Sequence, residues 1–162
     1  MRSIAVIRST MILMKKSYLT HSITVFLVAF VVSLTWSYFA RHMYSYNMDF
    51  PVIFGINSYP LICWTLALTA GCLLVDYLLK RLRITRFSLR LIGTISFYFI
   101  AVIIAETVGY HVFGVKDTST AQYPGLPLCD CLHAPRWMQF AYFALGPLHW
   151  VVTQALPWTR QR

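Results

Sequence analysis

Glu106 is the residue whose type and position point most clearly to chemistry, because it is a lone carboxylate within the apolar segment 91–113. A charged side chain facing lipid costs about 3 kcal/mol, so Glu106 is expected to face the interior of a helical bundle, where acidic residues commonly serve a function. Tyr110 lies four residues further on and shares its helical face, and His111 follows directly. These residues predict a site at which Glu106 acts as a general acid, assisted by Tyr110 and His111.

A structural role for Glu106 is the alternative. Arg41 and His42 end the first apolar segment at a depth comparable to that of Glu106. An ion pair between Glu106 and Arg41 would then tie the two segments together. In either role the carboxylate is expected to point toward other helices and away from lipid.

A second group of reactive side chains lies in the last polar loop, where Cys129, Cys131 and His133 alternate with other residues. In an extended loop, residues two apart point to the same side, so these three side chains are expected to converge. They would supply three of the four ligands of a soft metal ion, with His111 or Glu106 as the fourth. The thiol pair alone predicts thiol–disulfide exchange, and the third interpretation is that both cysteines pack as small hydrophobic residues.

His149 lies deep within the apolar segment 137–158. A histidine at that depth either makes a hydrogen bond between helices or ligates a cofactor. A haem with two axial histidines would need a second histidine at matching depth, and no other histidine of the sequence lies there. The sequence therefore predicts a helix–helix hydrogen bond, and it indicates no particular cofactor.

The composition indicates a membrane protein. Of the 162 residues, 58% are hydrophobic and only 12% are charged, whereas soluble domains carry roughly 25% charged residues. A spanning helix needs about 20 apolar residues, so the chain has room for about four spans and forms one membrane domain, residues 1–162. The net charge of +9 does not indicate nucleic-acid binding, because the basic residues flank the apolar segments, where they determine topology.

The apolar segments predict the fold, an all-α bundle of four transmembrane helices. The helices are expected at residues 22–40, 51–75, 91–113 and 137–158, and a structured loop at 114–136 covers the Glu106 end. Length favours helix over strand, because only a helix satisfies its own backbone hydrogen bonds in lipid.

Prolines and small residues predict where this bundle is irregular. Pro60 is expected to kink the second helix, and Gly146-Pro147 the fourth. These kinks would leave room for a lipid-like ligand between the second, third and fourth helices. Ala70 and Gly71 are instead expected to allow close helix packing.

The basic residues predict the orientation of the chain. Eleven of the 14 lysines and arginines lie in residues 1–20, in residues 76–90 and after residue 158. Because basic connections stay in the cytoplasm, both termini are predicted to be cytoplasmic. Four of the five acids, including Glu106, then lie toward the outer side. The absence of an Asn-x-Ser/Thr acceptor agrees with a bacterial inner membrane as the location.

The four-helix plan with cysteines in an outer loop resembles quinone-coupled thiol oxidases. Those enzymes carry a Cys-x-x-Cys pair, whereas this chain has Cys129-Asp130-Cys131 and no cysteine in its first outer loop. Small membrane lycopene cyclases also place acids at a helix end, but their Pro-x-Glu-Glu signature is absent here. The sequence therefore assigns the chain to no family.

Three functions follow from these observations. The first is a subunit or assembly factor of a membrane complex, with loop 114–136 as its contact surface and membrane lipids, another membrane protein or a second copy as partners. The second is a membrane enzyme that acts on a lipid or isoprenoid-like substrate, with Glu106 as general acid. The third is an outward thiol-redox or metal-binding protein that uses Cys129, Cys131 and His133.

Overall fold

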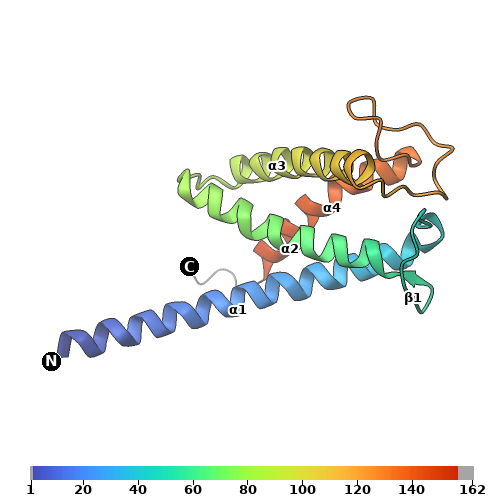
Figure 1. Ribbon diagram of the computed structural model, residues 1–162. Coiled ribbons are helices and arrows are strands. Elements are labelled where there is room, and N and C mark those ends of the chain that lie inside the picture. The colour runs from blue at the N-terminus through green and yellow to red at the C-terminus, as the bar shows by residue number, and fades with distance from the viewer. Residues whose placement is uncertain (1, 157–162) are drawn as a thin grey trace.

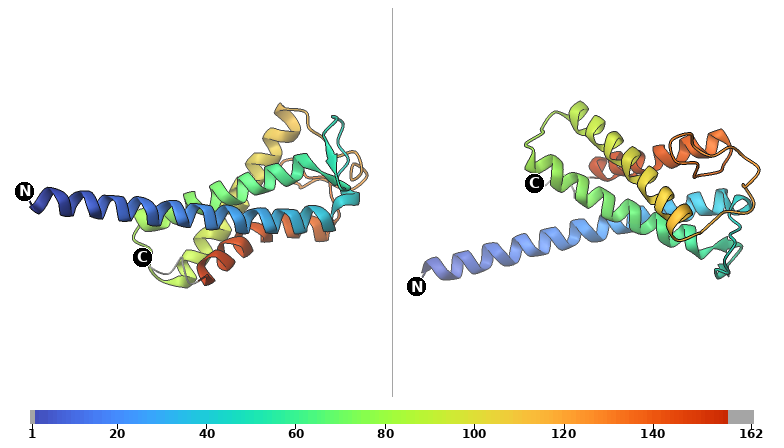
Figure 2. Two further views of the ribbon diagram at one scale, coloured as in Figure 1. Left: turned by 90° about the horizontal axis from the view of Figure 1, so that it is seen from below. Right: turned by 45° about the horizontal axis from the view of Figure 1, so that its top comes forward.

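The computed structural model describes the backbone of residues 2–156 and the side chains of residues 19–156. This part of the chain is mostly helical, with four α-helices: α1 (Arg2–Phe39), α2 (Ser58–Arg81), α3 (Phe87–Thr107) and α4 (Arg136–Ala155). Successive helices run in opposite directions, as Figures 1 and 2 show. One end of the molecule, here called the Glu106 end, therefore holds the connections 40–57 and 108–135. The opposite end, called the Asp76 end, holds the turn 82–86.

Three helical segments among the described residues are long and apolar enough to cross a membrane: Leu19–Phe39, Ser58–Arg81 and Phe87–Val112. The fourth predicted span, 137–158, is not among these segments. Its last two residues lie outside the described part of the chain. Polar side chains interrupt α4, and two of them, His149 and Thr153, are fully buried against the other helices.

The first helix is longer than the prediction of 22–40. It begins at Arg2 and runs without interruption to Phe39, because this stretch contains neither glycine nor proline. Its first half extends beyond the other helices (Figure 2). A short 3-10 turn, η1 (Arg41–Met43), follows it.

The second helix does not begin at residue 51 as predicted. Residues 52–57 form a hairpin instead, in which β1 (Val52–Ile53) pairs antiparallel with β2 (Ile56–Asn57). Phe54 and Gly55 make its two-residue turn with φ values of 51° and 75°, a conformation that matches the twist of paired strands and excludes a helix.

Asn57 marks the true start of α2. Its side-chain oxygen accepts a hydrogen bond of 3.0 Å from the backbone N–H of Tyr59, the usual way to cap a helix. Pro60 then lies in the first turn, where its missing N–H has no helical partner to lose. The predicted kink at Pro60 is therefore wrong, and α2 continues past the predicted end at residue 75 to Arg81.

The third and fourth helices lie close to their predicted positions. α3 continues into a π-helical turn, η2 (Val108–Val112), in which the N–H of Phe113 donates to the carbonyl of Val108 at 3.0 Å. π-Helical turns within helices frequently occur at functional sites. α4 runs through Gly146 and Pro147 to Ala155.

Tyr98 packs α3 against α2 and α4 in the middle of the molecule. It is buried, and its hydroxyl donates a 3.1 Å hydrogen bond to the carbonyl of Leu68. Gly71 and Gly146 provide the space, because a Cβ atom on either glycine would overlap the tyrosine ring. The predicted close packing at Gly71 is thus confirmed. His149 makes the expected hydrogen bond between helices, to the carbonyl of Val25 at 3.3 Å.

Candidate functional site

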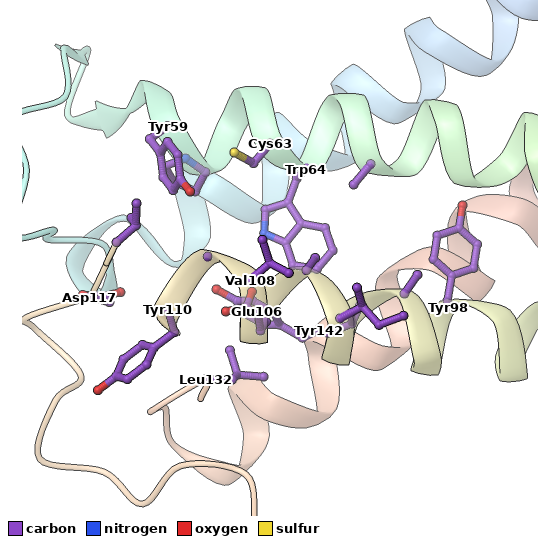
Figure 3. Close-up of a pocket in the computed structure, with 18 of the residues that line it drawn as sticks. Tyr59, Cys63, Trp64, Tyr98, Glu106, Val108, Tyr110, Asp117, Leu132 and Tyr142 are labelled. Atoms are coloured by element: carbon purple, nitrogen blue, oxygen red, sulfur yellow. The ribbon is translucent and has the colours of Figure 1, made fainter. Parts of the chain in front are cut away.

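A cavity of about 680 Å³ lies between α2, α3 and α4 at the Glu106 end. Its volume is within the range of roughly 300–1,000 Å³ that is usual for ligand sites. Figure 3 shows Cys63 and Trp64 on α2 facing Glu106 on α3 across this space, with Asp117 toward the outer loop and Tyr98 at the far end. The cavity lies where a lipid-like ligand was predicted, although the Pro60 kink did not create it.

Small side chains on two helices make this space. Ala67, Ala70 and Gly71 line it from α2, at a spacing that puts them on one helical face. Three small residues, each four positions from the next, line it from α3 and η2: Ala101, Ala105 and Gly109. Ala70 therefore borders open space and not a close helix contact, which corrects the prediction for that residue.

Of the predicted general acid and its two assisting residues, the structure brings two to the cavity. Glu106 and Tyr110 both line it, as their four-residue spacing predicted. His111 is exposed and does not line it; its Nε2 lies 2.7 Å from the carbonyl oxygen of Cys129, so it holds the loop. Within the described part of the chain, no hydrogen bond or ion pair reaches the half-buried carboxylate of Glu106.

Arg41 does not pair with Glu106. Its Nη1 donates to the carbonyl of Tyr38 at 3.1 Å, and its guanidinium lies 4.4 Å from the centre of the Tyr38 ring. Both contacts are local to the end of α1. The ion pair that was the alternative explanation for Glu106 is therefore absent between these two described residues.

Asp117 fastens the outer loop across the mouth of the cavity. Its Oδ1 accepts hydrogen bonds from the N–H of Ser45 at 3.2 Å, from the N–H of Ser119 at 3.0 Å and from the hydroxyl of Ser119 at 2.7 Å. Burial raises the pKa of Asp117, and these hydrogen bonds lower it in part. The loop after η2 is thus held against residues 44–47, where Tyr46 and Asp117 form an antiparallel bridge.

A chain of hydrogen bonds leads from the cavity wall into the core. Tyr142 lines the cavity, and its hydroxyl donates to the hydroxyl oxygen of Tyr44 at 3.1 Å. The indole N–H of Trp36 donates to the same oxygen at 2.6 Å. Burial raises the pKa of Tyr44 well above its ordinary value, so its hydroxyl stays protonated at neutral pH and ties α1 to α4.

The loop cysteines form a disulfide, Cys129–Cys131. Cys131 is fully buried and lies beside Thr107, whereas Cys129 is half-buried. His133, which lines the cavity, stacks on Tyr110 with ring centres 5.1 Å apart. The pair is thus in the oxidised form that thiol–disulfide exchange requires, next to the cavity wall.

The predicted metal set does not assemble in this form of the protein. Cys129 and Cys131 are bonded to each other, so neither thiolate is free to bind a metal ion. Nε2 of His133 instead lies 3.6 Å from Oδ1 of Asp130. Among the described residues, no three His, Cys, Asp or Glu side chains are grouped as metal ligands would be.

Sequence reasoning missed the most connected polar residue, Asp76. It was assigned to a loop at 76–90, but α2 continues to Arg81 and buries its carboxylate. Asp76 accepts hydrogen bonds from Arg90 at 3.1 Å, Trp150 at 2.9 Å and Gln154 at 3.2 Å. Nε2 of His21 lies 3.9 Å away, so Asp76 links all four helices. The apolar residues on both sides of Asp76 were the signal that the helix continues.

No family model, no curated protein and no solved structure matches this chain. The chemistry of the cavity therefore carries the functional argument. An apolar space with one carboxylate free of protein partners among the described residues can hold an amphiphilic molecule and bind, or exchange a proton with, its polar head.

Proposed function

We propose that this chain is a multi-pass membrane protein that binds a lipid or isoprenoid-like molecule in the cavity between α2, α3 and α4. Both termini lie in the cytoplasm of a bacterial cell, and the Glu106 end faces outward from the inner membrane. Three apolar helices of spanning length support the insertion, and the basic residues at the Asp76 end support the orientation. The disulfide fits an oxidising outer compartment.

The observation that carries the ligand is the cavity itself. Its walls are mostly apolar, and its volume of about 680 Å³ is large enough for a lipid-sized molecule. Glu106 reaches that space without a hydrogen bond or ion pair from the described residues. A polar head group from the occupant would supply the missing partner.

The experiment is mass spectrometry of small molecules extracted from the protein purified in a mild detergent. We expect the wild type to carry about one apolar molecule per chain. The Ala105→Phe variant fills the cavity from α3 and should lose it. Ile100→Phe is the matched control, because Ile100 is exposed on the same helix and does not line the cavity.

If the Ala105→Phe variant carries the same amount of the molecule as the wild type, the molecule binds to the outer surface, and the proposal is contradicted. Loss in both variants would also count against it, because the loss would then follow general disturbance of α3. The roles of Glu106 as general acid and of Tyr110 as its assistant stay predictions, which need the bound molecule to be identified first.

Thiol–disulfide exchange at Cys129 and Cys131 is a second candidate function, favoured by the disulfide. The bond closes a ring through a single intervening residue, and the entropic stabilisation from a disulfide is smallest for the shortest loops. A purely structural benefit is therefore small. A thiolate of an external dithiol would attack Cys129, the more accessible sulfur, and release the Cys131 thiolate. The second thiol of that dithiol would then attack the mixed disulfide, so that the dithiol leaves as a disulfide and both protein cysteines are reduced.

This second function is tested by mixing the oxidised protein with a reduced dithiol such as dithiothreitol and counting free thiols by mass. Two new thiols per chain are expected, and the Cys129→Ser and Cys131→Ser variants should show the same loss of exchange. A pair that resists reduction in the folded protein would exclude the function. Normal exchange in either single variant would show that the two cysteines do not act as a unit.

A role as subunit or assembly factor of a membrane complex stays a prediction. The exposed apolar side chains of α1, α2 and α3 suit lipid as well as another protein. A partner that copurifies with the wild type and depends on loop 114–136 would support it.

A further inference from the structure

The cavity wall contains two carboxyl groups in a strongly basic protein. Glu106 and Asp117 both line it, whereas none of the lining residues is lysine or arginine, although the chain contains 14 of these residues. A phosphate, sulfate or carboxylate head would find no lysine or arginine among the residues that line this space. The two carboxylates favour a head of the opposite charge.

Aromatic side chains also line the cavity. Tyr46, Tyr59, Trp64 and Tyr142 line it together with Glu106. The faces of such rings attract cations, and aromatic cages are a known solution for binding ammonium groups. The ring of Tyr110 already accepts one cation, because Nζ of Lys116 lies 4.7 Å from its centre.

The polarity of the wall also orients a ligand. Asp117 lies toward the outer loop, and Tyr98 lies at the opposite end of the cavity (Figure 3). Leu74 and Phe97, which are nearer in the sequence to the turn at the Asp76 end, also line the cavity. The head group would lie near Glu106 and the tail would extend along α2 and α3 toward Leu74. An amphiphile with one apolar tail fits this gradient.

Among the described residues, no ion pair involves Glu106 or Asp117. Lys116, which directly precedes Asp117 in the sequence, directs its Nζ to the ring of Tyr110. Nε2 of His133 lies 3.6 Å from Asp130, so a charge on this histidine would have its own partner. At 1.5 Å per residue, Arg90 at the start of α3 is about 24 Å from Glu106 along the helix. The basic turn at the Asp76 end is thus much farther from the head group than the two carboxylates are.

We propose that the molecule bound here is an amphiphile with a cationic, phosphate-free head, of the alkylammonium class. Its nitrogen lies between Glu106 and Asp117, among the aromatic side chains that line the cavity. This inference rests on the proposed function, since it identifies the ligand class of the same cavity.

The test is displacement of the apolar fluorophore N-phenyl-1-naphthylamine from the full chain in a neutral detergent. Three competitors share one tail and differ in charge: dodecyltrimethylammonium, dodecanol and dodecyl sulfate. We expect the ammonium to bind at least tenfold more tightly than the other two. Glu106→Gln should weaken ammonium binding about tenfold and leave dodecanol unchanged. Asp49→Asn is the matched control, because Asp49 is exposed and does not line the cavity.

The outcomes separate this inference from the proposed function. Equal or tighter binding of dodecanol, with the fluorophore bound, would overturn the cationic head and leave the lipid site in place. Failure of the wild type to bind the fluorophore or any competitor would overturn both. If Glu106→Gln is too unstable to purify, Asp117→Asn keeps the Oδ1 acceptor that holds its loop and should show the same selective loss.

Discussion

The surroundings of a carboxylate differ between the two ends of the molecule. At the Asp76 end, three donors from α3 and α4 satisfy one buried acid, and a histidine of α1 lies nearby. At the Glu106 end, an acid on α3 lines a cavity and receives no hydrogen bond or ion pair from any described residue. Large side chains fill the first end, including Trp150 and Leu79, whereas a cavity lies at the second.

This difference shows which acid has a structural role. A buried acid whose partners all come from the protein stabilises the fold, and removal of its charge weakens the hydrogen bonds that it accepts. An acid that faces a cavity without partners adds little to the fold and remains available to a ligand. An acidic residue is thus bound by protein partners at one end, and it has no hydrogen bond or ion pair from a described residue at the other.

The largest expected effect comes from Asp76→Asn. Arg90 would lose its anion, and removal of one partner of a buried ion pair costs up to several kcal/mol. Because the side chain of Arg90 is 22% exposed, we expect the free energy of unfolding to fall by about 3 kcal/mol. Thermal unfolding in detergent, followed by tryptophan fluorescence, measures this change. Arg86→Gln is the control, since Arg86 is exposed and its side chain does not cap α3; it should leave Tm unchanged.

Gly146→Ala is expected to cost about 1–3 kcal/mol, the usual effect of overpacking. The added methyl group would overlap the ring of Tyr98, which is held by its hydrogen bond to Leu68. Gly109→Ala is the matched control, because a Cβ atom there meets no other atom within 4 Å. Equal Tm values for the two variants would show that the tight contact at Tyr98 does not hold the middle of the bundle together.

Asp117→Ala should destabilise the protein by about 1–2 kcal/mol, since it removes the acceptor of three hydrogen bonds. Asp117→Asn keeps the Oδ1 acceptor and should be much less disruptive. Hydrogen exchange of the backbone N–H groups of Ser45 and Ser119 measures whether the loop remains attached. Equal protection in both variants would contradict a role for Asp117 in fastening the loop.

The same residue predicts a pH effect. Burial raises the pKa of Asp117 in the folded protein, so the folded state holds this proton more tightly than the unfolded state does. Stability from this group is therefore greatest below the ordinary pKa of 3.8 and falls as the pH rises through the raised value. Comparison of Tm against pH should show that Asp117→Asn lacks this decline. If the curves of Tm against pH are parallel for the variant and the wild type, Asp117 is not the cause of the decline.

The smallest expected effect on stability belongs to Glu106→Gln, the counterpart of Asp76→Asn. No described residue gives the Glu106 carboxylate a hydrogen bond or ion pair, so the free energy of unfolding should stay within about 0.5 kcal/mol of the wild type. The same thermal unfolding assay compares the two variants directly. A loss as large as that of Asp76→Asn would make Glu106 structural and would remove the contrast between the two ends.

The sequence by itself determined the helices and much of their chemistry. Apolar length and composition predict helices, because lipid offers the backbone no other partners. The positions of α3 and α4, the shared face of Glu106 and Tyr110, and the hydrogen bond of His149 all follow from local spacing. The hairpin before α2 was missed because Pro51 looks like a helix start, whereas Phe54 and Gly55 adopt the positive φ values of a turn.

Only the tertiary structure decided which polar groups meet. The partners of Asp76 come from residues up to 78 positions away, and neither helical periodicity nor a local motif predicts a pairing over that distance. The cavity likewise depends on the separation of α2 and α3 beyond Tyr98. The small residues on these helices allow such a space, but they do not determine its size. Local sequence preferences determine which residues form helices. Long-range packing decides whether an acid on those helices receives hydrogen bonds from the protein or remains available to a ligand.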